Sequence, residues 1–516
     1  MHEIPVLSLL IAIPSVSAAF LLLLGVITGR IHLKCFAVFS KYFVLVVSII
    51  ELILSILLGI NFKTSEWMQF NEQYDWISLG NLNISILLGI DGISLCFIIL
   101  TAILIPICLL ASWNYITHKI PLYFLLFLFT ESILMGFFSS LNILLFYVFF
   151  EAVLIPLFLI IGIWGGSKRI YATYKFFLYT FCGSLMMLIA IIYISIQQCN
   201  PLENTTGLAC AGGPSNMIVL GGFIQEQFWQ TQGWLWWFIF IGLAVKVPMW
   251  PFHTWLPYAH VQAPTGGSMV LAGVLLKMGG YGMIRLLIDP FPRLSAEFAD
   301  IVIVISIIGI IYASLVALAQ KDMKKLIAYS SVAHMGYVTA GLFSGQASGI
   351  SGAVFQMISH GILSPALFFI VGVLYERTHT KKISFYSGVA KVMPGLAVFF
   401  MISLLGSIGL PGTSGFVGEF ATIAATMHKN IWYGLLMSGG VVFGAVYMLK
   451  LYGSVMFHET NENSISLKDV SYREWMILAI LSALTIALGI YPSFVTTYVE
   501  NPLQYFGQFY EFSLNK

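Results

Sequence analysis

The chain has 516 residues, of which 59% are hydrophobic and only 9% are charged, and its formal net charge is +2. Soluble domains carry about 25% charged residues, so this composition excludes a soluble enzyme and predicts an all-α polytopic membrane protein. The six cysteines form no CxxC pair or Cys/His cluster, and no glycine-rich nucleotide loop occurs. We therefore expect no metal and no cofactor on this chain, and no nucleic acid among its partners.

Windows of about 20 apolar residues predict about fourteen transmembrane helices. The first begins near the N-terminus with no basic residues before it, so we expect a spanning helix and not a cleaved signal. The expected spans, in chain order, are 5–28, 35–60, 84–111, 121–139, 142–164, 175–197, 233–256, 265–288, 301–320, 325–344, 350–374, 395–427, 431–456 and 475–498. We divide the chain into 1–120 with spans 1 to 3, 121–288 with spans 4 to 8, 289–457 with spans 9 to 13, and 458–516 with span 14.

Basic residues set the expected orientation, because most of the 24 Lys and Arg lie in loops that follow odd-numbered spans. Cytoplasmic loops are enriched in Lys and Arg, so this pattern places those loops in the cytoplasm or matrix and both termini on the periplasmic or intermembrane side. The longest loops, 61–83 and 198–232, then lie on the outer face. Cys199 and Cys210 share the second of these loops, where they form either a disulfide or two free thiols.

Four ionisable residues lie near the middle of apolar spans: Glu151, Lys246, Lys277 and Glu419. Each costs about 2.5–3.5 kcal/mol at the centre of a spanning helix. Such residues usually face a protein interior or a water-filled path and mark routes for ions. We therefore expect this protein to move protons or small cations.

Two spans contain helix-breaking sequences next to these charges. Lys246 is followed by Val-Pro-Met-Trp-Pro, and two prolines three residues apart remove backbone donors from the helix. The sequence Leu-Pro-Gly-Thr-Ser-Gly at 410–415 interrupts the twelfth span, and Glu419 follows it. Paired broken helices in two halves of a chain point to a transport site, and their spacing suggests two five-helix repeats, spans 4–8 and 9–13. The alternative is two unrelated proline kinks.

Several polar residues of the spans allow a functional or a structural interpretation. Glu151 either belongs to the charge route, opposed by a lysine, or hydrogen-bonds neighbouring helices as structural glue. Lys277 is flanked by glycines that allow close helix approach. His334 and His360, which lie near several serines, are either satisfied core residues or a polar track that relays protons. Glu131 in the fourth span is a further candidate for pairing or relay.

Five segments carry a resemblance to a known family. They are Phe150-Glu-Ala-Val-Leu-Ile-Pro156, Val245-Lys-Val-Pro248, His253-Thr-Trp-Leu-Pro-Tyr-Ala-His260 with Ala263-Pro-Thr265 after it, Ala328-Tyr-Ser-Ser-Val-Ala-His334, and Pro411-Gly-Thr-Ser-Gly-Phe-Val-Gly-Glu-Phe420. In these segments the chain resembles the antiporter-like membrane subunits of respiratory complex I, NADH:quinone oxidoreductase. Among these subunits it resembles subunit M, which is chain 4 in mitochondria, and the resemblance covers about residues 84–457.

The resemblance implies fourteen helices with two inverted five-helix repeats and broken helices 7 and 12. It also implies a non-redox role in a translocase that couples NADH oxidation and quinone reduction to proton pumping. The implied roles are Glu151 and Lys246 as input pair, Lys277 as central relay, His334 and His360 as connecting positions, and Glu419 as terminal group. NADH, FMN, iron–sulfur clusters and quinone are then expected on partner subunits. The expected partners are other membrane-arm subunits, including sister antiporter-like subunits, and lipids.

Two alternatives stay open at this point. Subunits of multisubunit Na⁺/H⁺ antiporters and sister complex I subunits share the implied fold, but they usually carry lysine where this chain has Glu419. A purely structural scaffold of the membrane arm is the second alternative. The expected location is multi-pass in a bacterial plasma membrane or a mitochondrial inner membrane, and the sequence does not separate these two.

Overall fold

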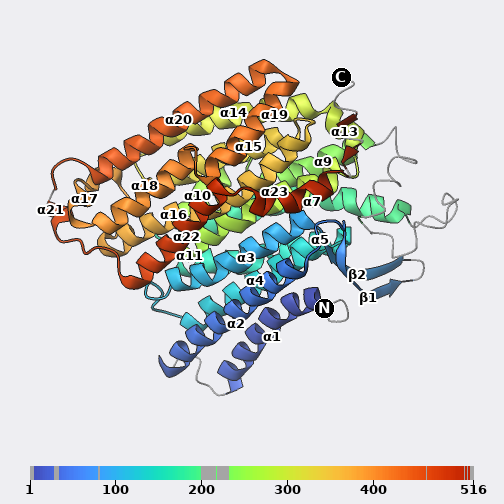
Figure 1. Ribbon diagram of the computed structural model, residues 1–516. Coiled ribbons are helices and arrows are strands. Elements are labelled where there is room, and N and C mark those ends of the chain that lie inside the picture. Colours follow the sequence, from blue (N-terminus) through green and yellow to red (C-terminus); the bar gives the residue numbers. More distant parts are fainter. Residues whose placement is uncertain are drawn as a thin grey trace.

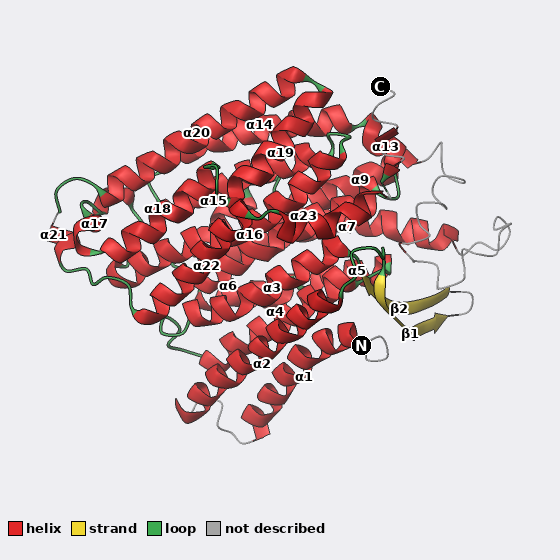
Figure 2. Cartoon of the chain, viewed as in Figure 1, coloured by secondary structure: helices red, strands yellow, loops and turns green. Residues whose placement is uncertain are grey.

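The computed structural model describes residues 5–27, 34–79, 82–198, 217, 232–460, 462–504, 506–507 and 510–511, so Cys199 and Cys210 lie outside the described part. Within it, long helices pack side by side into one bundle (Figure 1), and loops occupy its two ends (Figure 2). The helices of the first half are α1 (Val6–Ile27), α2 (Lys34–Asn61), α3 (Gly92–Ala111), α4 (Ile120–Ser139), α5 (Ile143–Ala152), α6 (Leu154–Trp164), α7 (Arg169–Gln198), α9 (Gln232–Lys246), α10 (Trp255–Gln262), α11 (Thr265–Val270), the π-helix η1 (Leu271–Leu275), α12 (Leu276–Met283) and the π-helix η2 (Ile284–Ile288). Those of the second half are α13 (Pro292–Glu297), α14 (Ala299–Leu318), α15 (Met323–Leu342), α16 (Ala347–Thr378), the 3₁₀ helix η3 (Ile383–Phe385), α17 (Val389–Val392), α18 (Pro394–Ile408), α19 (Ser414–Lys429), α20 (Ile431–Met456), α21 (Glu462–Ile465), α22 (Tyr472–Ile490) and α23 (Ser493–Gln504).

The membrane-spanning architecture agrees with the sequence prediction. Eleven helical segments of the described residues are long and apolar enough to cross a membrane. The other three expected spans are also helical: α15 has 20 residues, the seventh span is divided into α9 and α10, and the twelfth is divided into α18 and α19. The all-α bundle with about fourteen spans and interruptions in spans 7 and 12 is therefore confirmed. The fourteenth span is shorter than expected, because α22 ends at Ile490 and α23 begins after Pro492.

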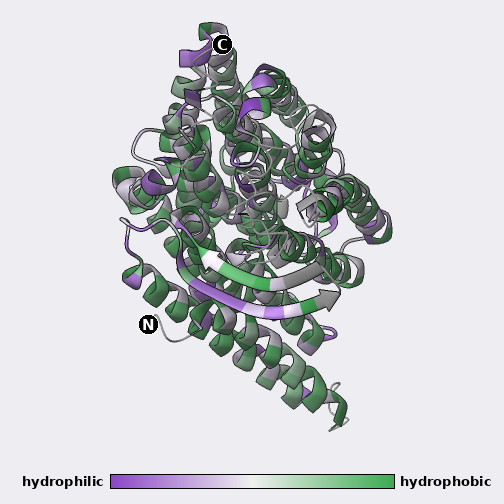
Figure 3. Cartoon of the chain, turned by 90° about the vertical axis from the view of Figure 1, so that its right-hand side faces the viewer, coloured by the Kyte–Doolittle hydropathy of each residue, from purple (hydrophilic) through white to green (hydrophobic). Residues whose placement is uncertain are grey.

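The segment before α3 is a correction to the sequence prediction. We expected a loop at 61–83 and a span from residue 84, but the chain forms a β-hairpin, β1 (Gln69–Leu79) and β2 (Leu82–Ile90), paired antiparallel with Gln69 opposite Ile90. The apolar sequence of β2 imitates the start of a span because this strand is buried against the bundle end; the amide of Leu141 donates to the carbonyl of Leu87 at 2.9 Å. Figure 3 shows the hairpin across that end, with a hydrophilic and a hydrophobic strand.

Asp91 separates the hairpin from the membrane helix that follows. Its carboxylate accepts from the backbone amide of Ser94 at 2.9 Å, which is an N-cap for α3. The same carboxylate forms a buried ion pair with Arg285 of η2, with a distance of 2.5 Å between Oδ1 and Nη2. Helix α3 therefore starts at Gly92, about eight residues later than the sequence pattern predicted, and is tied to the eighth span.

Both described ends of the chain lie on the hairpin side of the bundle (Figure 1). The amides of Leu7 and Ser8 donate to Glu72 of β1, and the Asn501 side chain donates to the carbonyl of Thr64 at 2.9 Å. A chain that crosses a membrane an even number of times has both ends on the same side, as observed.

The centre of the bundle consists of the eighth and eleventh spans. The apolar windows of Thr265–Ile288 and Ala347–Thr378 are 100% buried, whereas those of α1, α2 and α20 are only 28%, 39% and 33% buried. Exposed apolar side chains on the outer helices suit contact with lipid. The two central spans carry Lys277 and His360, so these polar groups lie inside the bundle and away from its outer helices.

Candidate functional site

The four ionisable residues expected to carry function each lie next to an interruption of regular α-helix. Glu151 is the penultimate residue of α5, two residues before the turn at Val153, where Pro156 removes a backbone donor. Lys246 is the last residue of α9. Lys277 follows the π-helix η1, and Glu419 lies in the second turn of α19 after the break at 409–413. Interruptions leave backbone carbonyls available, and a buried amine can bind such carbonyls.

Lys246 is held by backbone and ring atoms of the fifth span. Its Nζ donates to the carbonyl oxygen of Phe150 at 3.0 Å and lies 4.2 Å from the centroid of the Phe150 ring. The Trp255 indole donates to the carbonyl of Val245 at 2.9 Å, which satisfies one acceptor that the broken helix exposes. The lysine is therefore buried without being isolated.

Glu151 is the electrostatic neighbour of Lys246, but the two side chains are not in direct contact. Their charges interact, and Glu151 also forms a hydrogen bond with Ser184 of α7. None of the ion pairs found among the described residues joins Glu151 to Lys246. The fold thus places Glu151 and Lys246, the expected input pair, near each other without direct contact, so a small movement can change the strength of their interaction.

Lys277 contacts a histidine of the neighbouring central span. Its Nζ lies 2.8 Å from Nδ1 of His360 and also donates to the carbonyl oxygen of Ala272 in η1. Glycine makes this contact possible, since a Cβ added at Gly361 would lie 3.0 Å from the carbonyl oxygen of Gly273. The close crossing of η1 and α16 at these two glycines sets the distance between the amine and the imidazole.

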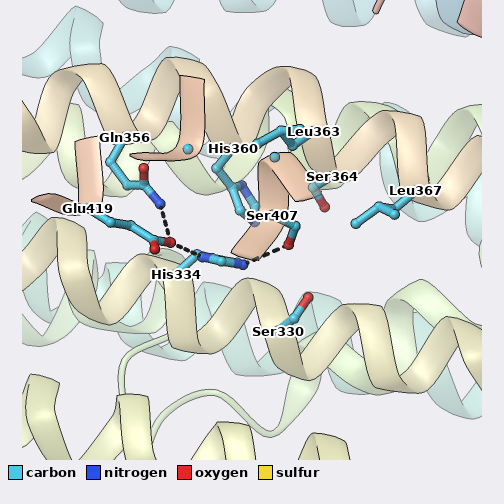
Figure 4. A pocket seen from close by; sticks show the side chains of 11 residues that line it. Ser330, His334, Gln356, His360, Leu363, Ser364, Leu367, Ser407 and Glu419 are labelled. Atoms are coloured by element: carbon cyan, nitrogen blue, oxygen red, sulfur yellow. Dashed lines mark hydrogen bonds and ion pairs between the residues drawn. The ribbon is translucent and has the colours of Figure 1, made fainter. Parts of the chain in front are cut away.

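Glu419 is bound by two side chains from two other helices (Figure 4). Its Oε1 lies 2.7 Å from Nδ1 of His334 in α15, and it accepts a hydrogen bond of 3.0 Å from Nε2 of Gln356 in α16. Nε2 of His334 lies 3.2 Å from the Ser407 hydroxyl in α18. The carboxylate at the second helix break is therefore a buried acceptor, oriented by both neighbours.

A short gap separates the two contacts. The ring centroids of His334 and His360 are 5.6 Å apart, and Nε2 of His360 has no hydrogen-bond partner within the described part of the chain. A cavity of about 10 Å³, lined by both histidines, Ser330, Ser364 and Ser407, lies here. This volume holds about one water molecule. We name Lys277, His360, His334 and Glu419 the Lys/His row.

The serines of the expected polar track lie along this row. Ser331 and Ser364 are 3.2 Å apart through their hydroxyls, and Ser359 donates to Ser414 at 2.8 Å. Sequence reasoning missed Gln356, Ser407 and Ser184, since neutral polar residues carry no insertion cost that reveals them. Gln356 had one usable signal, because it precedes His360 by four residues and so shares its helix face.

Glu131 lies apart from the Lys/His row. No hydrogen bond or ion pair among the described residues joins it to Lys277, His360, His334 or Glu419. It is completely buried in α4, and its charged neighbour is Glu51 of α2, which sequence reasoning missed although it lies within an apolar span.

Comparisons with known proteins show the family to which this chain belongs. Residues 140–444 match the family described as "NADH:quinone oxidoreductase/Mrp antiporter, TM". NADH-quinone oxidoreductase subunit M of Rickettsia bellii is 48% identical over 96% of each chain, and that of Rhodobacter capsulatus is 45% identical over 92% of each. NADH-ubiquinone oxidoreductase chain 4 of Chondrus crispus is 43% identical over 88% of this chain and 89% of its own.

Solved structures show the same fold. A chain of respiratory complex I from Thermus thermophilus with bound NADH has a TM-score of 0.84 at 28% identity, over 99% of this chain and 100% of that one. A chain of the Mrp complex from Dietzia sp. DQ12-45-1b has a TM-score of 0.83 over 97% of this chain and 96% of its own, and at 18% identity this shows the fold alone. The chain therefore belongs to the subunit M (chain 4) family of NADH:quinone oxidoreductase membrane subunits.

Proposed function

We propose that this chain is a proton-translocating, non-redox subunit of an NADH:quinone oxidoreductase, and that protons pass along the Lys/His row. One observation carries the proposal. Two direct contacts, Lys277 to His360 at 2.8 Å and His334 to Glu419 at 2.7 Å, stand on either side of a cavity for about one water. The row therefore joins the eighth span to the broken twelfth span through groups that can each hold a proton.

The contacts define the proton-carrying atoms. The Lys277 ammonium donates to Nδ1 of His360, so the neutral histidine carries its own proton on Nε2, the atom that has no partner among the described residues. When Nδ1 takes the lysine proton, Nε2 can release one to water in the cavity, and the imidazole is neutral again. His334 takes up the next proton from that water, and its contact with Glu419 leads onward to the carboxylate.

The input to the row is the Glu151 and Lys246 pair. Helix α12 packs against the end of α9 so closely that a Cβ at Gly279 would lie 2.8 Å from the backbone nitrogen of Val247. A change in the interaction between Glu151 and Lys246 therefore reaches the segment that carries Lys277. In this proposal, quinone chemistry elsewhere in the complex drives that change, and Lys246 shares or passes its proton towards Lys277.

The remaining parts of the proposal concern the assembly. The partners are other membrane-arm subunits, including sister antiporter-like subunits, together with lipid. NADH, FMN, the iron–sulfur clusters and quinone are bound by partner subunits. The hairpin face with both termini is the periplasmic or intermembrane side, because the opposite loops hold most of the basic residues.

The test is pumping by the assembled complex after Lys246→Ala or Glu151→Ala. We expect both variants to lower quinone reductase activity as well as proton pumping in reconstituted vesicles, because a blocked proton step should arrest a shared conformational cycle. Lys450→Ala is the matched control, since Lys450 is an exposed lysine of a spanning helix. Normal pumping by assembled Lys246→Ala would favour a structural scaffold, and pumping that requires sodium would favour a Na⁺/H⁺ antiporter.

A further inference from the structure

The N-terminal helices contain a second set of buried ionisable groups. Helices α1 to α4 carry two acidic residues, Glu51 in α2 and Glu131 in α4. Both side chains are completely buried, and none of their four carboxyl oxygens has a hydrogen-bond partner within the described part of the chain. Helix α2 packs against α4, and the two carboxyl groups interact electrostatically.

No basic side chain on the packed elements lies beside the two carboxyl groups. Helices α1 and α3 carry no charged residue, and α5, which packs on α4, contributes only Glu151. The two lysines of α2 are distant: Lys41 precedes Glu51 by ten residues, or about 15 Å along the helix, and binds the carbonyl of Trp113. The other, Lys34, is exposed at the start of α2.

Charges of the hairpin, which touches α1 and α4, do not neutralise the two groups either. Glu72 of β1 adds a further negative charge and is bound by the amides of Leu7 and Ser8. Asp91, after β2, is already paired with Arg285.

A third polar side chain completes the cluster. The hydroxyl of Ser55 is buried and also has no hydrogen-bond partner among the described residues. Ser55 follows Glu51 by four residues, so the two share one face of α2. Within the described residues these five oxygen atoms have no partner and no cation beside them, which points to a ligand that binds oxygen and carries positive charge.

We propose that Glu51 and Glu131 share protons and form a second proton-binding site, separate from the Lys/His row. A buried carboxylate without a partner is strongly unfavourable, and two that interact are worse, so one can be ionised only while the other keeps its proton. A proton bound by either group removes one of the two negative charges and supplies the missing hydrogen-bond donor. The existence of this site does not depend on conduction through the row.

Infrared spectroscopy of the assembled complex tests the proposal directly. A protonated carboxyl group has a C=O absorption distinct from that of a carboxylate, and this band shifts in D₂O. We expect a difference between the wild type and the Glu51→Gln/Glu131→Gln double variant at neutral pH, with loss of the protonated band in the variant. Glutamine keeps the shape of the side chain and removes the titratable group. Spectra that show no lost protonated band would overturn the proposal.

A second measurement needs no variant and covers the case in which the double variant fails to assemble. Dicyclohexylcarbodiimide, an apolar reagent, adds to protonated carboxyl groups, and mass spectrometry of peptides locates the modified residue. We expect modification at Glu51 or Glu131 at neutral pH and less at high pH. Glu66 is the matched control, because this exposed carboxylate is paired with Lys63 and should stay unmodified. Modification at neither buried residue, or at Glu66 alone, would count against a shared proton.

Discussion

Close contacts of glycines set the geometry of the Lys/His row. Replacing such a glycine with alanine should push the helices apart, and the larger the displacement, the greater the expected loss of pumping. A Cβ at Gly415 would lie 1.9 Å from the carbonyl oxygen of Gly406, and ordinary contact begins at 3.4 Å, so the start of α19 must move by about 1.5 Å. The same displacement would lengthen the 2.7 Å contact between His334 and Glu419 to about 4.2 Å, beyond hydrogen-bond range.

The effect at Gly361 should be smaller. A Cβ there would lie 2.7 Å from Cδ2 of Leu100, a side chain that can rotate away, and 3.0 Å from the Gly273 oxygen, so the backbone must shift by about 0.4 Å. The 2.8 Å contact between Lys277 and His360 would then reach about 3.2 Å, the limit of a normal hydrogen bond. A misplacement of 1 Å costs roughly 100-fold in rate, so we expect Gly415→Ala to lose about 100-fold or more and Gly361→Ala only a few-fold.

The assay is proton pumping by the complex in reconstituted vesicles, normalised to assembled complex, with quinone reductase activity measured in parallel. Gly439→Ala is the control, because a Cβ there meets no atom within 4 Å, and alanine favours the helix by about 1 kcal/mol. Overpacking costs about 1–3 kcal/mol, so assembly of Gly415→Ala should be checked by thermal stability first. An assembled Gly415→Ala complex that pumps like Gly439→Ala would refute the reasoning.

Three further predictions follow from the contacts. Glu151→Gln should be less active in pumping than Glu151→Asp, because glutamine can keep the Ser184 hydrogen bond but loses the charge that faces Lys246; equal activity would return Glu151 to a structural role. Glu419→Lys should retain part of the pumping, whereas Glu419→Ala should not. The reason is that the Gln356 amide can rotate and present its oxygen, which has no partner among the described residues, to an amine. An assembled but inactive lysine variant would show that negative charge is required. Arg285→Met should destabilise the protein by about 3–5 kcal/mol by leaving Asp91 buried and unpaired, and the thermal midpoint should recover in part when Asp91→Leu is added.

The charged members of the site could be predicted because each one costs so much inside a lipid bilayer. Glu151, Lys246, Lys277 and Glu419 stood out against apolar spans, and prolines and glycines next to them predicted the broken helices. Glu51 carries the same insertion cost, but no basic or helix-breaking residue lies next to it to indicate a functional span.

Neighbour contacts could not be predicted in this way. The pairing of His334 with Glu419 joins residues 85 positions apart, and the distance between Lys277 and His360 depends on a glycine crossing and on the π-helix η1. Neither a π-helix nor a helix crossing leaves a periodic signal in spans that are apolar all round. The hairpin was missed for a related reason, since a strand buried against other parts of the protein has the same apolar sequence as the beginning of a span.

The gap between His334 and His360 also bears on energy conservation. A membrane that stores a proton gradient is discharged by any uninterrupted hydrogen-bonded path between its two faces, just as a wire discharges a battery. Within the proposed Lys/His row, the 5.6 Å between the two ring centroids interrupts that path deep inside the protein, beside a cavity large enough for about one water. Filling this space with a larger apolar side chain would insulate the membrane, whereas widening it to hold a permanent file of water would let the stored gradient leak away as heat.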